Sequence, residues 1–216
     1  MATLIGRNTR VEVEKTLASG KSITAISKAN PGVITFATSA HGIANGDIFV
    51  LESITGMVEL EGQIAKATGV SGVSVSIKGI DTTGFGTFTS GGGSVAKEIT
   101  AWSTLGKARS LNAGTVAPNK LDSTVLIDSD KSFVLGQNET PEVAVEALSD
   151  VFASGMIKIE SSSRSGTALG FRATMSDNST RVFRGYVSLP SENIPLADLV
   201  TQGFSIVQIK RRMAYA

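Results

Sequence analysis

Alternating hydrophobic and polar residues mark several strands of this chain. Residues 10–15 read Arg-Val-Glu-Val-Glu-Lys, which places Val11 and Val13 on one face of an extended strand and Glu12 and Glu14 on the other. This pattern predicts a half-buried strand. Further strands are predicted at residues 95–102, 169–174, 180–189 and 204–211.

Only one segment has helical spacing. Thr140-Pro141-Glu142 offers an N-cap hydroxyl, a proline suited to the first helical position and an early carboxylate. Apolar residues then recur at helical spacing up to Phe152, and Gly155 is placed to end the element. We therefore expect a helix over residues 140–155. Alternation returns in Ile157-Lys-Ile159-Glu, which predicts a strand, and the serine-rich stretch 161–166 then predicts a hairpin tip.

The block from Pro31 to Gly93 is rich in glycine and threonine. Short β-type runs such as 33–36 and 48–51 are separated by turn sequences, of which Asn45-Gly46-Asp47 is the clearest. Gly91-Gly-Gly-Ser94 resembles a flexible joint at the end of the block. This spacing is typical of a small all-β module set inside another domain.

These elements predict a mainly β protein. We expect an antiparallel β-sandwich or barrel with one packed α-helix, interrupted by a small all-β insert domain. The predicted boundaries place residues 1–21 and 94–216 in the main domain and residues 22–93 in the insert. The polar stretch 111–120 is expected to be a long loop.

The composition excludes several classes of partner and of chemical site. The 216 residues carry a net charge of +1, which gives no uniform field to attract nucleic acid or an anionic membrane. Cysteine is absent, so disulfides, thiolate metal sites and cysteine nucleophiles are excluded. The N-terminal residues lack the apolar core of a secretory signal, and no apolar run is long enough for a membrane helix. We expect synthesis in the cytoplasm and no membrane span.

Candidate chemistry is sparse. His41 is the only histidine, and its place between turn signals favours a structural role. Asp128 and Asp130 lack the further ligands of a calcium loop, so a turn is the better interpretation. An acidic patch in the insert is interpreted as a solvated face rather than a glycosidase pair. It comprises Asp47, Glu52, Glu59 and Glu61. We expect no enzyme activity, no catalytic residues, no cofactor and no metal.

A few residues are candidates for contacts between copies of the chain. The pair Leu4-Ile5 lies outside any regular pattern and is a candidate docking arm, and Trp102 is a candidate for subunit packing. The basic run Lys210-Arg211-Arg212 is interpreted as a solvated strand end or a set of salt-bridge donors for a neighbouring subunit.

The motif order of the insert resembles a β module of phage tail proteins that is named for its likeness to a domain of ubiquitin-activating enzymes. Two departures are Glu61, where that module commonly has Asn, and Phe85, where it often has Tyr. The matching motifs are Pro31-Gly-Val-Ile-Thr, His41-Gly42, Asn45-Gly46-Asp47, Gly56-Met57, Leu60-Glu61-Gly62, Asp81-Thr-Thr-Gly84-Phe85-Gly86 and Ser90-Gly91-Gly92.

The surrounding chain is similar in layout to phage tail tube proteins. That resemblance implies a structural virion protein whose stacked rings, usually hexameric, form the conduit for phage DNA. The implied partners are further copies of the chain, other tail proteins such as the tape measure and tail terminator, and DNA that passes without specific binding. The implied location is the phage tail. Leu4-Ile5, the stretch 103–123 and the C-terminal tail are the candidate arms.

Two alternatives remain open at this point. One is another tail component, such as a tube-to-baseplate adaptor. The other is a carbohydrate- or cell-surface-binding module, in which loops of the insert around Phe85 would contact the ligand.

Overall fold

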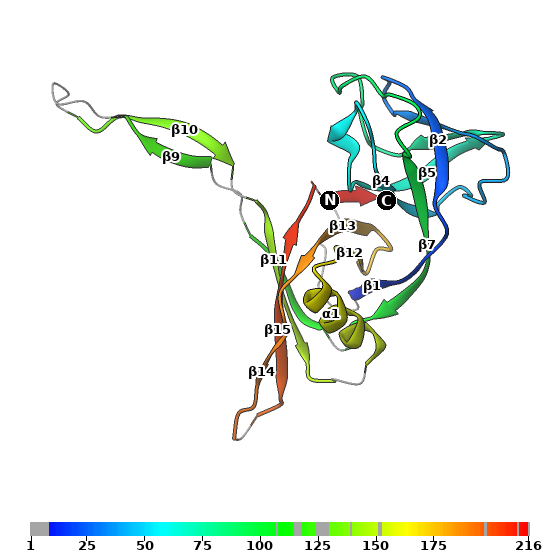
Figure 1. Cartoon of the computed structure of the whole chain (residues 1–216). Helices are drawn as coiled ribbons and strands as arrows, with labels where there is room; N and C mark the ends of the chain where they lie inside the picture. The colour runs from blue at the N-terminus through cyan, green and yellow to red at the C-terminus, as the bar shows by residue number, and fades with distance from the viewer. Residues whose placement is uncertain are drawn as a thin grey trace.

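The structure of the chain is a computed structural model, and it describes residues 9–106, 108–114, 118–123, 130–138, 140–150, 153–196, 198–210 and 212–215. All strand pairs in this part of the chain are antiparallel, and strands dominate it. One α-helix accompanies them. The predicted fold class, a mainly β antiparallel architecture with a single helix, is therefore confirmed (Figure 1).

Six strands form a closed circuit in the first half of the chain. Their order is β2, β3, β6, β5, β4 and β7, and β2 pairs again with β7. Their bounds are β2 Lys21–Ile26, β3 Val33–Phe36, β4 Ile48–Glu52, β5 Ile64–Ser71, β6 Ser74–Ile77 and β7 Val95–Thr104, with a 3-10 turn η1 at Val58–Leu60. Closure leaves this small barrel without a free edge along the circuit.

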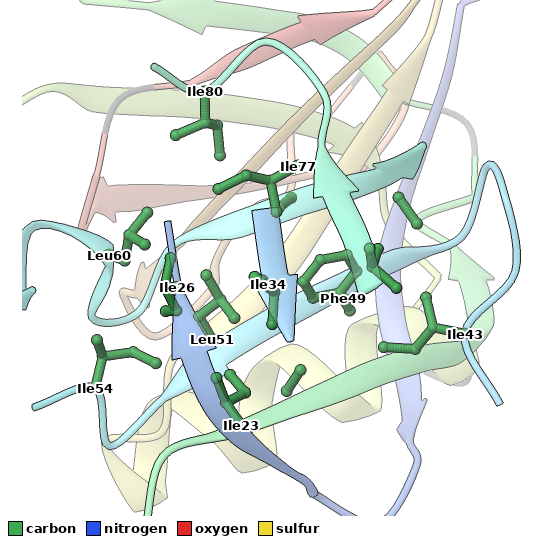
Figure 2. Packing of buried hydrophobic residues seen from close by; sticks show 14 of the residues in the cluster. Ile23, Ile26, Ile34, Ile43, Phe49, Leu51, Ile54, Leu60, Ile77 and Ile80 are labelled. Atoms are coloured by element: carbon green, nitrogen blue, oxygen red, sulfur yellow. The ribbon is translucent and has the colours of Figure 1, made fainter. Parts of the chain in front are cut away.

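The barrel has a core of its own. Ile34, Phe49 and Leu51 are fully buried at its centre and are surrounded by isoleucines from every side (Figure 2). This cluster draws its buried residues from Ile23 to Ala96. The predicted domain division at residues 22–93 stays a prediction. Strand β7 pairs with β4 and β2 through its first half and with β1 through its second half, so the barrel and the main sheet share this strand.

The same sheet continues beyond β7 into the rest of the chain. Its order from there is β1, β12, β13, β15, β11 and β8, with β14 paired to β15 and β16 paired to β13. The bounds are β1 Arg10–Leu17, β8 Ala108–Ala113, β11 Glu142–Leu148, β12 Leu169–Thr174, β13 Thr180–Val187, β14 Ser191–Asn193, β15 Thr201–Gln208 and β16 Met213–Tyr215. Two more strands, β9 Pro118–Asp122 and β10 Phe133–Asn138, form a separate hairpin.

The helix α1 spans Ser154–Ser165 and covers one face of the main sheet (Figure 1). Met156 and Ile159 are buried against the second core cluster, which includes Phe171 and Phe183 with their rings stacked 5.5 Å apart. Gly166 ends the helix in the left-handed conformation, where the absence of a Cβ avoids strain.

The predicted position of the helix is wrong. Residues 142–148 form strand β11, in which Val143, Val145 and Ala147 are buried and the intervening residues face outward. This period-two pattern, with two β-branched residues, outweighs the N-terminal helix signals. The predicted strand at 157–160 and hairpin tip at 161–166 are also wrong, since residues 157–165 lie within α1 and Gly166 caps it. Likewise, the expected loop at 111–120 includes parts of β8 and β9.

Strand β1 is buried on both faces rather than on one. Val11 and Val13 face the second core, as the alternation predicts, but Glu12 and Glu14 are also buried, with exposed fractions of 1% and 3%. The strand lies between β7 and β12, and side chains from both neighbours cover its second face. This face therefore holds two buried carboxylates.

A third core cluster joins the barrel to the main sheet. Ile48, Val50 and Ile64 from the barrel meet Val182 on β13 and Tyr215 on β16 in this cluster. The Tyr215 hydroxyl accepts a hydrogen bond of 3.2 Å from the Lys66 backbone N–H. The C-terminal strand therefore anchors the barrel to the main sheet.

Candidate assembly surfaces

The hairpin of β9 and β10 projects away from the rest of the molecule (Figure 1). Leu121, Phe133, Val134 and Leu135 are each more than half exposed on it, with fractions of 54–60%. Among the described residues, the hairpin pairs with no third strand. A two-stranded hairpin is marginally stable alone in water, so its exposed apolar side chains are a candidate interaction surface. Within the hairpin, the Lys120 Nζ lies 4.9 Å from the centre of the Phe133 ring.

A second apolar projection precedes β15. Ile194, Leu196 and Leu199 are exposed by 71%, 109% and 60% in the loop that connects β14 to β15. We call residues 194–199 the apolar tip, and its described side chains make no part of any core cluster. The tip extends from the sheet at the end opposite to the β9–β10 hairpin (Figure 1).

The main sheet also ends in an unpaired edge. Strand β8 pairs with β11 on one side and with no described strand on the other. The Gly114 N–H donates to the Glu142 carbonyl at 2.8 Å, so alternation along the strand directs the Ala113 and Leu111 N–H groups toward the open side. An edge of this kind can accept a strand from another chain.

The face of β11 opposite the core is acidic. Glu142 and Glu146 are exposed there, and the register places Val207, Ser205 and Gly203 of β15 beside this row. The sheet face that α1 leaves open thus presents the two carboxylates beside Val207, Ser205 and Gly203.

Comparison with protein families identifies this architecture. Residues 55–196 match the family model described as "Phage tail tube protein, TTP". The chain belongs to the phage tail tube protein family. It is a structural component of phage tails, consistent with the predicted resemblance of the main domain. The match begins inside the insert, and the resemblance of that insert to the ubiquitin-activating-enzyme-like module stays a prediction.

A solved structure also resembles this tail tube family member. The match is to a chain described as "Tail of empty GTA particle computed with helical refinement, C6 symmetry", with 8% sequence identity and a TM-score of 0.41. It covers 53% of this chain and 87% of the other. A search of curated proteins found no match.

The structure describes some of the predicted contact residues of this tail tube chain. Leu4, Ile5 and Arg211 lie outside the described residues. Trp102 is half-buried on β7, and the Arg172 guanidinium lies 4.5 Å from the centre of its ring. Trp102 therefore has an intramolecular cation–π partner, and its role between subunits stays a prediction.

The other predicted contact residues lie where the C-terminal segment meets the barrel. The Lys210 Nζ lies 3.5 Å from the Val58 carbonyl oxygen. Phe85 and Arg212 line one cavity of about 510 Å³. Burial, followed by repulsion from Arg181, lowers the pKa of Arg212. A role in subunit contacts stays a prediction for Lys210 and Arg212, and a role at the surface of the insert stays a prediction for Phe85.

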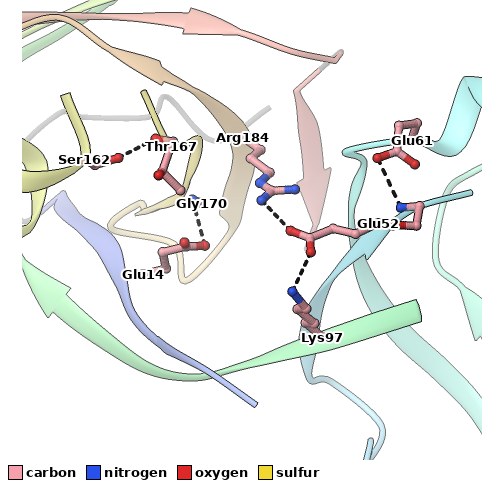
Figure 3. A network of polar contacts seen from close by, with 9 residues as sticks. Glu14, Glu52, Glu61, Lys97, Ser162, Thr167, Gly170 and Arg184 are labelled. Carbon is pink, nitrogen blue, oxygen red and sulfur yellow. Dashed lines mark hydrogen bonds and ion pairs between the residues drawn. The ribbon is translucent and has the colours of Figure 1, made fainter. Parts of the chain in front are cut away.

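The candidate residues for chemistry have structural partners within the insert. The His41 ring stacks on Phe36 with centroids 4.6 Å apart, and its Nδ1 accepts from the Ile43 N–H at 3.1 Å. Glu61, which is labelled in Figure 3, accepts from the backbone N–H groups of Ser53 and Ile54. These contacts hold both side chains in the fold of the insert.

Two further acidic residues of the insert also accept hydrogen bonds from the backbone. Glu59 accepts from the Gly86 N–H, and Asp47 accepts from the Ala44 N–H. Asp128 lies outside the described residues, while Asp130 is exposed. Within the described part of the chain, no three His, Cys, Asp or Glu side chains group as a metal site. No helix there has the length and apolarity to cross a membrane.

Sequence reasoning largely missed the two most exposed apolar surfaces. The first strand of the hairpin lies in the stretch 103–123, which was predicted only as a candidate arm, and the tip was assigned no role. Both segments carry a sequence signal for an exposed apolar surface. The run Phe133-Val-Leu lies outside any predicted core element, and Ile194-Pro-Leu places apolar residues beside a turn-forming proline.

Proposed function

We propose that the chain is a tail tube subunit whose copies close into hexameric rings, and that stacked rings form the conduit for phage DNA. The observation that carries this proposal is the open edge of β8 in a protein of the tail tube family. An exposed edge in a soluble β protein invites aggregation unless another chain covers it. In a ring every such edge is paired, because each subunit offers its open edge to one neighbour and covers the open edge of the other.

The complementary edge in our proposal is β14. Its three residues, Ser191–Asn193, are all exposed, and β14 pairs with β15 on one side only. Strands β8 and β14 lie on opposite sides of the β11–β15 pair, so edge-to-edge pairing would relate neighbours by a head-to-tail rotation. In our proposal the rotation divides a full turn evenly, so its repetition closes a ring. The ring number of six comes from the tail tube resemblance.

We further propose that the acidic face of β11 lines the channel. Glu142 and Glu146 repeat in every subunit, and carboxylates repel the phosphates of passing DNA. Binding of DNA depends on basic side chains that neutralise phosphates, and a conduit must avoid such binding. This arrangement allows passage without specific contact.

The barrel formed by β2 to β7 would then be an outer decoration. It lies at the end of the strand order opposite to β8 and β11, and it has a separate core. Other tail proteins, including the tape measure and the tail terminator, are the expected partners at the channel and at the tube end. In this proposal the protein has a structural role and performs no enzymatic step.

The experiment is a proline substitution at the open edge. Ala113→Pro removes an N–H that points away from β11, so it blocks pairing with a neighbour and spares the internal ladder. Ala113→Val keeps that N–H and is the matched control. Sedimentation velocity should give a species of six times 22.4 kDa for the wild type and Ala113→Val, and monomers for Ala113→Pro. Rings of undiminished yield from Ala113→Pro would contradict edge pairing.

A further inference from the structure

A cavity of about 510 Å³ lies where β16 of the C-terminal segment meets the barrel. Leu60, Ile80 and Phe85 supply apolar lining from the barrel, and Met213 supplies it from β16. Phe85 and Met213 also pack against the barrel core, and Leu60 and Ile80 lie at the edge of that core (Figure 2). The fold therefore holds this apolar lining in place. Sites for small molecules typically have volumes of about 300–1,000 Å³, so the cavity is large enough for such a ligand.

A buried amide in the lining has one hydrogen-bond acceptor without a partner. Gln63 lines the cavity although the residue is only 7% exposed. Its Nε2 donates a hydrogen bond of 2.8 Å to the Ile64 carbonyl, which fixes the orientation of the amide. No donor among the described residues reaches its Oε1, and this oxygen keeps some exposure. A polar atom in such a position favours a ligand that brings an O–H or N–H group.

Another lining residue carries a positive charge without a counter-charge. Arg212 is half-buried directly before β16, and it forms no ion pair with a carboxylate of the described residues. Arg181 lies near it on β13, where it pairs with Ala214 of β16. Burial and then repulsion from Arg181 lower the pKa of Arg212, as expected for a cation that lacks an anionic partner. An anionic group on a ligand would supply that partner.

Glu59 adds a second free acceptor to the lining. Its Oε1 accepts a hydrogen bond of 3.0 Å from the Gly86 N–H, which positions the carboxylate, and no described donor reaches its Oε2. The other carboxylate of the lining, Asp81, already has partners for both oxygens, because Thr83 donates to Oδ1 and Asn30 donates to Oδ2. The cavity therefore combines an apolar wall with two free acceptor oxygens and one unpaired guanidinium.

We propose that this cavity binds a sugar acid, a hydroxylated ring that carries a carboxylate. The carboxylate accepts hydrogen bonds from the Arg212 guanidinium, whose planar donors match two carboxylate oxygens. Ring hydroxyls donate to Gln63 Oε1 and Glu59 Oε2, and the C–H face of the ring lies against Phe85. The barrel and β16 form the cavity without β8 or β14, so this inference goes beyond the proposed function and does not rest on it.

Simpler ligands would complete only part of this lining. A small anion such as acetate would pair with Arg212 but leave the Gln63 Oε1 without a donor. A neutral sugar would donate to the free oxygens but leave the Arg212 charge unpaired. Discrimination therefore requires both the carboxylate and the hydroxyl groups on one ligand.

Three matched ligands test this chemical class. Galacturonate has a carboxylate where galactose has a hydroxymethyl group, and acetate supplies the carboxylate alone. Saturation-transfer NMR titrations of the full-length wild type measure the dissociation constant of each ligand. We expect galacturonate to bind at least about tenfold more tightly than galactose or acetate, because only it makes both the ion pair and the hydroxyl contacts. Acetate or galactose binding as tightly as galacturonate would overturn the inference, and so would the absence of saturable galacturonate binding.

Two variants assign the contacts to residues. Arg212→Gln should weaken galacturonate binding at least about tenfold and abolish its preference over galactose. Gln63→Met is similar in size but lacks the free acceptor, so it should weaken both sugars alike and keep the preference. Arg164→Gln is the matched control, because the Arg164 side chain is 68% exposed on α1 and is not part of the cavity. Circular dichroism checks that each variant is folded. Wild-type preference for galacturonate in folded Arg212→Gln would overturn the inference.

Discussion

Arg184 on β13 donates a hydrogen bond to the Glu52 carboxylate on β4, with 2.6 Å between Nη2 and Oε1 (Figure 3). Lys97 on β7 lies 2.7 Å from the other carboxylate oxygen. The three residues come from the main sheet, the barrel and the strand that the two share. This ion-pair network therefore holds the barrel in a fixed position on the main sheet, together with the Tyr215 anchor.

Replacing the shared carboxylate should loosen this junction. Arg184 is only 10% exposed, so Glu52→Gln leaves a buried cation without its charged partner, and we expect a loss of about 2 kcal/mol in the free energy of unfolding. Lys97→Met is the control, because the Lys97 side chain is 35% exposed and the variant should lose at most about 1 kcal/mol. Urea denaturation measures both. Equal losses of unfolding free energy for the two variants would show that buried Arg184 does not need the charge of Glu52 for stability.

The pH dependence of this junction has a definite sign. Burial alone would raise the pKa of Glu52, but hydrogen bonds from Lys97 and Arg184, with their charges, outweigh it and lower the pKa below 4.5. The contribution of ionised Glu52 to the free energy of unfolding is therefore present above pH 4.5 and lost as the pH falls through the lowered pKa. The difference in unfolding free energy between wild type and Glu52→Gln should shrink in acid.

Glu14 should behave in the opposite way. Burial raises its pKa above 4.5, although the Gly170 N–H donates to its Oε2 at 2.9 Å and partly offsets the effect. The folded state then binds more protons than the unfolded state between pH 4.5 and the raised value, so stability falls as the pH rises through that window. We expect Glu14→Gln to be more stable than the wild type at neutral pH and to lose this advantage below pH 4.5.

The neighbouring Glu12 provides the contrast. Its carboxylate lies 2.6 Å from the Arg172 guanidinium and 2.7 Å from that of Arg10, so Glu12→Gln leaves both guanidinium groups without their charged partner. We expect it to lose about 1.5–3 kcal/mol at neutral pH. Chemical denaturation at several pH values compares both variants. Destabilisation of the same size by Glu14→Gln would mean that Glu14 is held as a carboxylate.

Gly155 near the start of α1 should not tolerate alanine. Helix propensity alone favours the substitution by about 1 kcal/mol. A Cβ at this position, however, would lie 2.6 Å from the Thr104 carbonyl oxygen, and backbone cannot move aside cheaply. We expect Gly155→Ala to lower the melting temperature. Ser161→Ala, at an exposed position on the same helix, should leave it unchanged or raise it slightly. A stabilised Gly155→Ala variant would place the helix farther from β7.

Tyr215 should resist ionisation. Burial raises its pKa to about 12, while the hydrogen bond from Lys66 acts weakly in the other direction. Tyr186→Phe leaves Tyr215 as the only tyrosine, so ultraviolet absorbance can follow its titration directly. We expect phenolate to appear near pH 12, with stability lost as the pH rises from 10 toward that value. Titration near pH 10 while circular dichroism still reports the fold would contradict a buried Tyr215.

The sequence predicted the β architecture because its turn signals are local. Glycine and asparagine at positions such as Asn45 and Gly46 favour turns whatever surrounds them, so the strands between them could be recognised. The helix failed for the opposite reason. Ala144 and Leu148 have helical spacing, whereas Val143 and Val145 alternate as in a strand. Packing of the two valines against sheet partners distant in the sequence decided for a strand.

The junction and the assembly surfaces were beyond sequence reasoning for a related reason. Glu12 and Glu14 alternate with valines and so suggest a solvent-facing row, yet Arg172 and Gly170 cover them from more than 150 positions away. Exposure of Leu135 and Leu196 likewise depends on what fails to pack against them. Only the fold provides that information.

Electron microscopy of the purified wild-type chain at high concentration tests the central claim most directly. The account predicts rings of one fixed subunit number that stack into tubes with an open central channel. A chain that stays monomeric at every concentration and salt condition would contradict it.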